Sequence, residues 1–280
     1  MTRRAHPARI LALACWAATL PAWSQPAAPG SAAGAPSPAP AGPRLPTLFL
    51  IGDSTVNNST KGQMGWGKAL PAHFDTKRLA IVNAARGGRS SRTFFTEKLW
   101  AAVAADLQPG DFVLIQFGHN DGGSLRQNAT RASLKGAGEE TQEITDPKTA
   151  EKVTVHTYGW YLRQYVRGAK AQGAMPIILS QVPRNLWKDG KVGRVADGYG
   201  KWAAEVARAE GVPFVDLNAI VADRYDREGE KQVGSTYFDP ADHTHTLPAG
   251  AKVNAACVAE GLRALKACPL AGFLRPVASP

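Results

Sequence analysis

The chain has 280 residues, of which 44% are hydrophobic and 20% charged, so it can bury a sizeable core. This composition excludes a disordered protein, a collagen and a coiled coil. Beyond residue 24 no apolar run approaches the roughly 20 residues that a membrane-spanning helix needs, which excludes an integral membrane protein. The three cysteines are too few for a disulfide scaffold. The formal net charge of +10 leaves the kind of partner to be argued from the motifs.

The first 24 residues have the three parts of a secretory signal peptide. Three of the first nine residues are arginines, residues 10–20 form a short apolar stretch, and Ala-Trp-Ser at 22–24 has the small-x-small pattern of a cleavage site. We expect cleavage after Ser24, a secreted or periplasmic protein, and no membrane insertion after cleavage.

The rest of the chain divides into a linker, one domain and a short tail. Residues 25–46 hold seven prolines and seven alanines and predict an extended linker. Residues 47–273 contain no second linker and no internal repeat, so we expect a single domain, followed by a tail at 274–280. After signal cleavage only Cys257 and Cys268 remain, and two readings stay open, a disulfide that holds the last helix or two free thiols.

Short apolar runs alternate with helical patterns along the domain. The runs are Thr47–Ile51, Leu79–Asn83, Phe112–Phe117, Pro176–Leu179 and Pro213–Asp216. They are continuous, as in strands that are covered on both faces. Helical patterns occupy Tyr158–Gln172, Tyr199–Glu210 and Ala249–Ala267. The alternation predicts an α/β protein with a five-stranded parallel sheet between two helical layers, and a site at the carboxyl ends of the strands.

Three of the predicted strands end in residues that suit acyl transfer. Ser54 follows a glycine at the end of the first strand and could act as a nucleophile, although Gly, Asp and Ser also suit a turn. Gly88 follows the second strand, where paired glycines can direct N–H groups at developing negative charge or simply form a turn. Asn120 follows the third strand and could donate a side-chain N–H, or form an Asx turn.

The run from Asp239 to Thr246 contains a carboxylate and an imidazole just before the last helix. A serine nucleophile needs a histidine base, and that base needs a carboxylate to fix its tautomer, so Asp242 and His245 fit these roles. A metal site is the alternative reading, with His243 and His245 joined by Asp242 or His119. No cysteine or H-E-x-x-H pattern supports it.

Together these blocks resemble the SGNH (GDSL-type) hydrolases. The four blocks are Gly-Asp-Ser at 52–54, Gly88, Gly118-x-Asn120 and Asp242-x-x-His245. Further segments resemble rhamnogalacturonan acetylesterases: Gly-Trp-Gly at 65–67, Gly-Arg-Ser-Ser-Arg at 88–92, Gln-Phe-Gly-His-Asn-Asp at 116–121 and Ser-Gln-Val-Pro-Arg-Asn at 180–185. The segment 122–156 is longer and more charged than the minimal pattern and flanks the expected site.

The resemblance implies a flavodoxin-like three-layer α/β/α sandwich and a serine esterase that acts on acetylated polysaccharide or oligosaccharide. It implies that Ser54 is the nucleophile, His245 the base and Asp242 its orienting carboxylate. It also implies an oxyanion hole formed by the backbone N–H groups of Ser54 and Gly88 and the side chain of Asn120. No metal or organic cofactor is required, and we expect a monomer.

A basic loop, defined here as residues 184–194, suggests a use for the positive charge. It carries four cations and one acid around a tryptophan: Arg184, Lys188, Lys191, Arg194, Asp189 and Trp187. The loop could attract a pectic galacturonate polymer and stack on a sugar, or it could be a solvated basic face. The candidate substrate-binding residues are Arg89, His119 and Trp187.

Other functions remain as alternatives. The motifs also suit an acetylxylan esterase or a broader esterase, lipase or thioesterase of the same superfamily. A carbohydrate-binding protein without catalysis is a third possibility, which the intact serine, aspartate and histidine argue against. Nucleic acid is excluded as a partner, since no zinc-finger spacing, RNP-like run or basic helix with interleaved aromatics is present.

Overall fold

The structure is a computed structural model that describes residues 44–147, 149–195 and 197–276. The predicted signal peptide, the linker up to residue 43 and the last four residues lie outside the described part. Residues from Arg44 onward form one compact unit.

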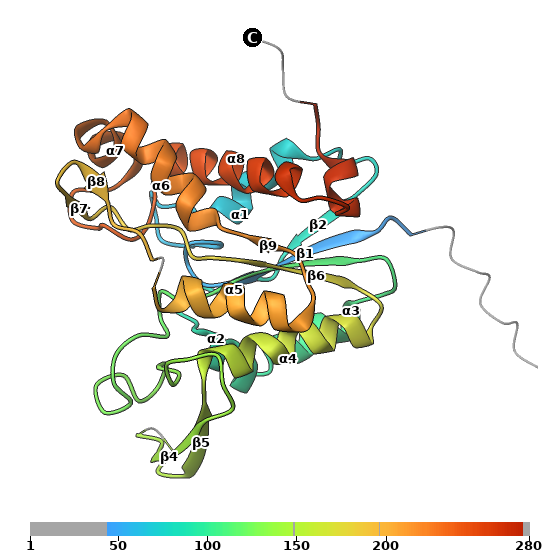
Figure 1. Cartoon of the computed structure of the whole chain (residues 1–280), viewed down its shortest axis with the longest axis vertical. Coiled ribbons are helices and arrows are strands. Elements are labelled where there is room, and N and C mark those ends of the chain that lie inside the picture. The colour runs from blue at the N-terminus through green and yellow to red at the C-terminus, as the bar shows by residue number, and fades with distance from the viewer. Residues whose placement is uncertain (1–43, 148, 196, 277–280) are drawn as a thin grey trace, which may run out of the picture. The chain divides into compact units, whose positions relative to one another are not determined.

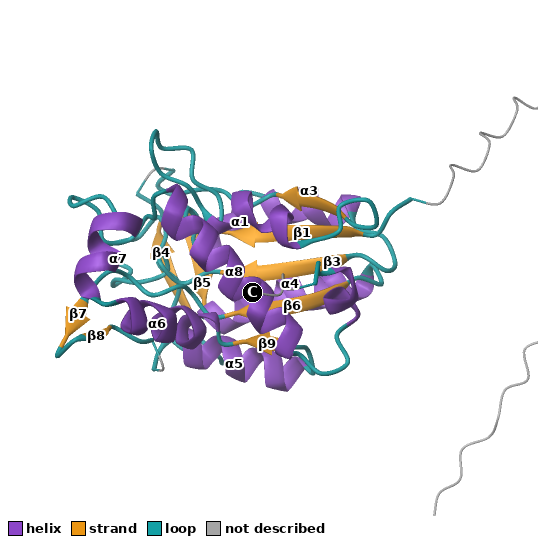
Figure 2. Cartoon of the chain, turned by 90° about the horizontal axis from the view of Figure 1, so that it is seen from above, coloured by secondary structure: helices purple, strands orange, loops and turns teal. Residues whose placement is uncertain are grey.

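A five-stranded parallel sheet forms the centre of this unit (Figure 2). Its strands are β1 (Thr47–Gly52), β2 (Ala80–Asn83), β3 (Phe112–Gln116), β6 (Met175–Leu179) and β9 (Phe214–Val215). Their order in the sheet is β2-β1-β3-β6-β9. The order reverses between β1 and β3, so the chain builds one half of the sheet and then the other, which places a crevice beyond the carboxyl ends of β1 and β3. The predicted fold class is confirmed.

Helices cover both faces of the sheet (Figure 1). One layer contains α1 (Trp66–Ala69), α6 (Leu217–Glu228), α7 (Glu230–Tyr237), α8 (Pro248–Ala264) and the 3₁₀ helices η1 (Leu70–His73) and η2 (Pro269–Phe273). The other contains α2 (Ser91–Thr96), α3 (Leu99–Asp106), α4 (Tyr158–Ala171) and α5 (Tyr199–Glu210). The predicted helices correspond to α4, α5 and α8, and α5 ends as expected at Gly211, which is left-handed with a φ of 61°.

Two apolar cores separate the sheet from the two helical layers. Alternate residues of a strand point to opposite faces. Leu48 and Leu50 of β1 therefore pack with the α8 layer, whereas Phe49 and Ile51 pack with the α4 layer. All four are buried, which explains why the strands appear in the sequence as unbroken apolar runs.

Two antiparallel hairpins, which the sequence did not predict, extend from the sandwich. One pairs β4 (Thr141–Thr145) with β5 (Lys152–His156), and the other pairs β7 (Trp187–Lys188) with β8 (Lys191–Val192). The segment before β4 is fixed to α4, because Arg163 donates to the carbonyl of Gly138 at 2.7 Å and pairs with Glu139 at 2.6 Å. This anchoring positions the inserted segment against the α2–α4 layer.

Contacts at both ends of the described part, together with the cysteines, complete the fold. Arg44, inside the predicted linker, donates to both carboxylate oxygens of Asp111 at 2.8 and 2.6 Å. Arg275 donates its backbone N–H to the carbonyl of His73 at 2.9 Å. Cys257 and Cys268 are buried free thiols, and burial raises the pKa of Cys257 to about 12. Within the described residues, no helix has both the length and the apolar character to cross a membrane.

Candidate active site

The nucleophile candidate stands on a tight turn at the end of β1. The backbone N–H groups of Val56 and Asn57 both donate to the carbonyl of Asp53, which closes one turn around Ser54. Gly52, two residues before Ser54, has no room for a side chain, because a Cβ there would lie 2.5 Å from the carbonyl oxygen of Gln116. β1 and β3 lie close together at this point, and Ser54 follows directly beyond the carboxyl end of β1.

Ser54, His245 and Asp242 form a continuous hydrogen-bonded chain, although 191 residues separate the first two. Ser54 Oγ lies 2.8 Å from His245 Nε2, and His245 Nδ1 lies 2.7 Å from Asp242 Oδ2. A carboxylate can only accept, so the assigned tautomer has the proton on Nδ1. Nε2 is then free to accept the serine proton. A chain of this geometry can generate a serine nucleophile.

The Asp242 carboxylate is held ionised by its own loop. Its Oδ1 accepts the backbone N–H groups of Thr244 and His245 at 2.8 and 3.0 Å. Gln63, just before α1, donates to Oδ2 at 2.9 Å. Burial raises the pKa of Asp242, but the hydrogen bonds from His245 and Thr244 outweigh burial and hold this pKa well below its usual value. The histidine therefore always faces a charged partner at neutral pH.

Hydrogen-bond donors converge beside Ser54. Gly88 has a φ of 77°, a left-handed conformation that favours glycine, and it follows Gly87, whose Cβ position would lie 3.6 Å from Ser54 Cβ. Among the described residues, the backbone N–H groups of Ser54 and Gly88 donate to no protein acceptor. Asn120 lines the same cavity. These groups can act together on one oxygen atom.

The side chain of Asn120 is oriented by two contacts. Its Nδ2 donates to the carbonyl of Arg89 at 3.0 Å, and its Oδ1 accepts from Arg131 at 3.1 Å. An amide nitrogen carries two N–H groups, so one remains for a ligand after the bond to Arg89. Arg131 fixes which end of the amide is the donor.

Asp121 ties three segments together behind these donors. Its carboxylate accepts the backbone N–H of Ser91 at 3.1 Å, the hydroxyl of Ser91, and the hydroxyl of Ser133 at 3.1 Å. It thereby joins the loop after β3 to the start of α2 and to the inserted segment. Burial raises the pKa of Asp121 to about 6, with the bonds from Ser91 and Ser133 acting in the opposite direction.

A second buried network lies under the nucleophile. Trp66 Nε1 donates to Gln116 at 2.8 Å, Gln116 donates to the Thr55 hydroxyl at 2.7 Å, and that hydroxyl donates to Asp53 at 2.7 Å. The network joins α1 and β3 to the turn that carries Ser54. It accounts for the Gly-Trp-Gly and Gln-Phe-Gly segments seen in the sequence.

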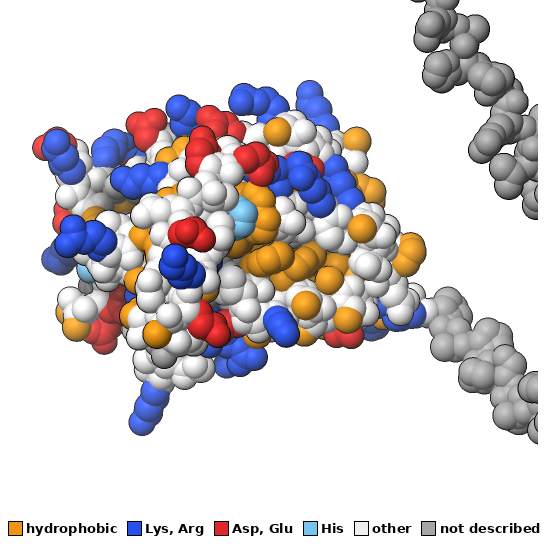
Figure 3. All heavy atoms as spheres, turned by 90° about the horizontal axis from the view of Figure 1, so that it is seen from below, with side chains coloured by type: hydrophobic (Ala, Val, Ile, Leu, Met, Phe, Trp, Pro, Cys, Tyr) orange, Lys and Arg blue, Asp and Glu red, His pale blue; other side chains and the backbone are white. Residues whose placement is uncertain are grey.

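A cavity of about 410 Å³ opens in front of Ser54 and His245. No large apolar side chain lines it among the described residues, and the lining residues are Ser54, Asn58, Ser59, Thr60, Arg86, Gly87, Gly88, Arg89, Asn120, Arg131 and His245. Three arginines line it, and no acid does among the described residues. The face of the molecule seen in Figure 3 has a different charge pattern from this cavity, because basic (blue) and acidic (red) side chains are mixed on it around an apolar area (orange).

The structure brings together six of the eight predicted site residues. Five of them line the cavity, namely Ser54, Gly88, Arg89, Asn120 and His245, with Asp242 directly behind His245. His119 is not among the lining residues; both of its ring nitrogens are buried, and burial lowers its pKa. Trp187 is not among the lining residues either; it packs against the α8-side core and donates to Asn185 at 2.7 Å.

The alternative metal reading finds no support in the geometry. Across residues 44–147, 149–195 and 197–276, no three His, Cys, Asp or Glu side chains gather in a way that could hold a metal ion. Instead, both ring nitrogens of His245 are used by Ser54 and Asp242.

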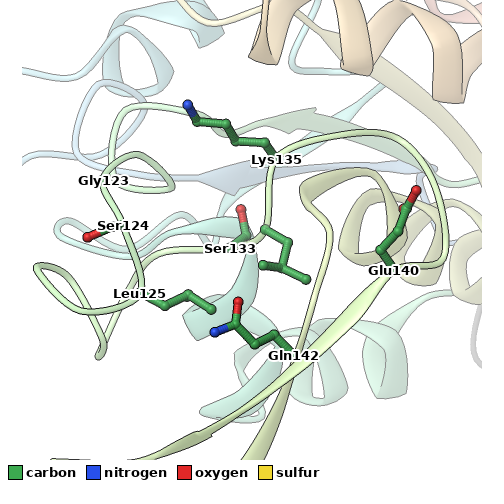
Figure 4. A pocket seen from close by; sticks show the side chains of 8 residues that line it. Gly123, Ser124, Leu125, Ser133, Lys135, Glu140 and Gln142 are labelled. Atoms are coloured by element: carbon green, nitrogen blue, oxygen red, sulfur yellow. The ribbon is translucent and has the colours of Figure 1, made fainter.

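A second cavity of about 420 Å³ lies within the inserted segment (Figure 4). Lys135 and Glu140 stand on opposite sides of it, and Leu125 and Gln142 point toward one another. No serine–histidine pair lines it in the described structure. The chemistry therefore belongs to the cavity in front of Ser54.

Comparisons with known proteins agree with this geometry. Residues 50–253 match the model of the GDSL-like Lipase/Acylhydrolase family. The chain belongs to this family. It is an ester-hydrolysing enzyme.

Two relatives with assigned names are similar to this chain over most of its length. A rhamnogalacturonan acetylesterase of Emericella nidulans is 38% identical over 207 residues, which cover 74% of this chain and 80% of that protein. The probable rhamnogalacturonan acetylesterase YesY of Bacillus subtilis is 31% identical, over 78% of this chain and 93% of its own length. The crystal structure of protein YxiM from Bacillus subtilis superposes with a TM-score of 0.63 at 24% identity. The match covers 79% of this chain and 56% of that one, and it supports the fold.

Several residues at the site were missed from the sequence. Gln63 holds Asp242, and Arg131 holds Asn120. Arg86 lines the cavity, and Asp121 joins its supporting loops. Asp121 ends the 116–121 segment and Arg86 lies two residues before Gly88, but neither was predicted to be a site residue. Arg131 lies in the long inserted segment, where no sequence pattern marks it.

Proposed function

We propose that the protein is an exported serine esterase that removes O-acetyl groups from plant cell-wall polysaccharide, with acetylated pectic rhamnogalacturonan as its substrate. The observation that carries this proposal is the chain from Ser54 through His245 to Asp242 at the wall of a polar, cationic cavity. The names of the relatives support the pectic substrate. The pattern of the first 24 residues supports export.

In the proposed reaction, Ser54 Oγ attacks the acetyl carbonyl while His245 Nε2 takes the serine proton. His245 then gives this proton to the departing sugar oxygen, which leaves an acetyl-enzyme and a free hydroxyl. Water attacks the acetyl-enzyme with His245 again as base, and acetate departs as the proton returns to Ser54. Asp242 keeps the imidazole oriented and stabilises its charged form.

The negative charge that develops on the carbonyl oxygen meets three donors: the backbone N–H groups of Ser54 and Gly88, and Nδ2 of Asn120. Each donor of this kind typically contributes about 10²–10³ in rate. The donors are fixed before substrate binds, so little reorganisation is needed during the reaction.

The cavity wall favours a sugar ester over a lipid. A long acyl chain needs an apolar slot to gain from burial. No large apolar side chain lines this cavity among the described residues. Hydroxyl, amide and guanidinium groups suit the hydroxyls of a saccharide.

The test is acetate release from acetylated rhamnogalacturonan and from acetylated xylan, with the wild type, Ser54→Ala and Ser235→Ala. Ser235 is an exposed serine on α7 and serves as the matched control. We expect release mainly from the pectic polymer, a loss of about 10⁴–10⁶-fold in Ser54→Ala, and no loss in Ser235→Ala. A phosphonate probe should label the wild type at Ser54.

Release mainly from xylan would overturn the pectic substrate and leave the esterase mechanism in place. Undiminished release by Ser54→Ala would overturn the mechanism. Release from neither polymer would overturn the polysaccharide substrate.

A further inference from the structure

The three arginines of the cavity wall differ in what already binds them. Arg89 pairs with Glu97 at 2.9 Å and donates to the carbonyl of Gly87 at 3.1 Å. Arg131 donates to Asn120 at 3.1 Å. The guanidinium of Arg86 makes no ion pair and no hydrogen bond with any described residue, and Arg86 is exposed at the cavity. One cation whose side chain has neither an ion pair nor a hydrogen bond within the described structure therefore faces the space in front of Ser54.

The backbone of Arg86 is fixed although its side chain is not bound. Its N–H donates to the carbonyl of Gly52 at 3.0 Å, and its carbonyl accepts from Arg89 at 3.3 Å. Gly52 is two residues before Ser54, and Arg86 is two residues before Gly88. The Cα of Arg86 is therefore held in place relative to both the turn that carries Ser54 and the proposed oxyanion hole.

No acid among the described lining residues competes for this guanidinium, so it is available to an anionic ligand. A guanidinium presents two parallel N–H groups that match a carboxylate, and such pairs are among the stronger hydrogen bonds. The acetylated sugar must place its ester carbonyl at Ser54. A ligand that binds both groups carries an O-acetyl group and a carboxylate on the same or a neighbouring sugar ring.

The geometry points to Arg86 as a subsite for the carboxylate of a uronic acid residue, which makes it the residue that distinguishes acetylated uronate from acetylated neutral sugar. This inference rests on the proposed function and adds to it a specificity-determining residue. It also means that the substrate's carboxylate is recognised at the cavity wall rather than at the basic loop.

The experiment compares acetate release from two forms of an acetylated galacturonate oligosaccharide, the free acid and its carboxyl methyl ester. The enzymes are the wild type, Ser54→Ala, Arg86→Gln, Arg86→Lys and Arg208→Gln. Arg208 is an exposed arginine on α5 with no side-chain partner among the described residues, so its variant removes the same charge away from the cavity.

We expect wild type to prefer the free acid, and Arg86→Gln to lose about 10- to 100-fold in kcat/KM on that substrate, mainly through KM. Its rate on the methyl ester should stay within about twofold of wild type. Arg86→Lys should recover part of the loss because it keeps the charge without the paired N–H groups. Arg208→Gln should match wild type. Added salt should reduce the preference of wild type for the free acid.

Equal losses by Arg86→Gln on both substrates, or no loss on either, would overturn the assignment. Acetate release from the methyl ester that depends on Ser54 tests the proposed esterase separately, because this substrate offers Arg86 no carboxylate. Should wild type release acetate from neither form, the proposed function and the subsite would fail together.

Discussion

The basic loop at 184–194 and the cavity wall are both rich in cations, but the partners of these cations differ. In the loop, Arg194 pairs with Asp223 and, at 2.9 Å, with Asp226. Lys191 lies 3.6 Å from the same Asp226. At the cavity wall, Arg86 has no acidic partner in the described structure. Two of the four loop cations therefore hold the hairpin to α6, whereas Arg86 at the cavity remains available to a ligand.

The buried acids of the two regions show the same contrast. Burial raises the pKa of Asp226, but the N–H of Val192 and the nearby Arg194 outweigh this, so the pKa is lowered. Among the described residues, Asp121 behind the cavity receives side-chain hydrogen bonds only from the neutral groups of Ser91 and Ser133, and burial raises its pKa to about 6. The Val192 N–H and the Arg194 cation together outweigh the burial of Asp226, whereas the serine groups around Asp121 do not outweigh its burial.

Among variants that keep Ser54, His245 and Asp242, the largest effect should come from Asn120→Ala, which removes the one proposed oxyanion donor that is a side chain. We expect kcat to fall by about 10²–10³-fold with little change in KM, because the donor acts mainly on the transition state. Steady-state kinetics on an aryl acetate and on the acetylated oligosaccharide check this result. A loss confined to the oligosaccharide would instead make Asn120 a substrate-binding residue.

A feature could be predicted from the sequence when the residues that indicate it are close neighbours in the chain. The strands, α4, α5 and α8 were predicted because their apolar periodicity is set by neighbouring residues. The chain from Ser54 to His245 was predicted because each member sits in a short motif at a strand or helix end. The bonds of Gln63 to Asp242 and of Arg131 to Asn120 were not, since they join residues 179 and 11 positions apart that no shared motif links.

The sequence left two interpretations of the basic loop open, a substrate-binding surface or a solvated basic face, and neither took distant acids into account. The acids that pair with Arg194 and Lys191, Asp223 and Asp226, lie about 30 residues further along the chain, on α6. Counting charge within the loop therefore overstated the net charge of this region of the folded protein.

The raised pKa of Asp121 predicts a pH-dependent contribution to stability. Its folded pKa of about 6 lies above the ordinary 3.8, so the native state binds this proton more readily than the unfolded state does. Its contribution thus falls as pH rises from about 4 to about 6, by on the order of 2 kcal/mol. Asp121→Asn removes this titration. The free energy of unfolding of this variant should therefore rise relative to that of wild type as the pH increases from about 4 to about 6.

Urea unfolding of both proteins at several pH values across this range measures the difference. Asp226→Asn is the matched control, because the lowered pKa of Asp226 places its titration below about pH 4, so the difference in stability between this variant and wild type should stay nearly constant across the measured range. A difference between Asp121→Asn and wild type that does not vary with pH would contradict the raised pKa.

A smaller effect is expected from Arg131→Met, because Arg131 acts through Asn120 as a positioning residue. Without the bond to Oδ1, the amide of Asn120 can rotate and present its oxygen to the substrate. We expect kcat to fall about tenfold on both charged and neutral acetyl esters, roughly the value of one charged hydrogen bond. Arg126→Met, at an exposed arginine of the same segment, is the control. A loss in KM on the charged ester alone would show that Arg131 binds carboxylate as well.

Arg194→Gln should have the smallest effect and the most direct bearing on the contrast between the two regions. It removes the cation beside Asp226, whose side chain is only 6% exposed, while Arg194 itself is 35% exposed. Solvent screening of the arginine limits the loss in unfolding free energy to about 1 kcal/mol. Because Arg194 does not line the cavity, kcat/KM on the charged and neutral esters should not change. Should Arg194→Gln instead lose activity selectively on the free acid, as Arg86→Gln is expected to do, the basic loop would bind substrate despite its acidic partners.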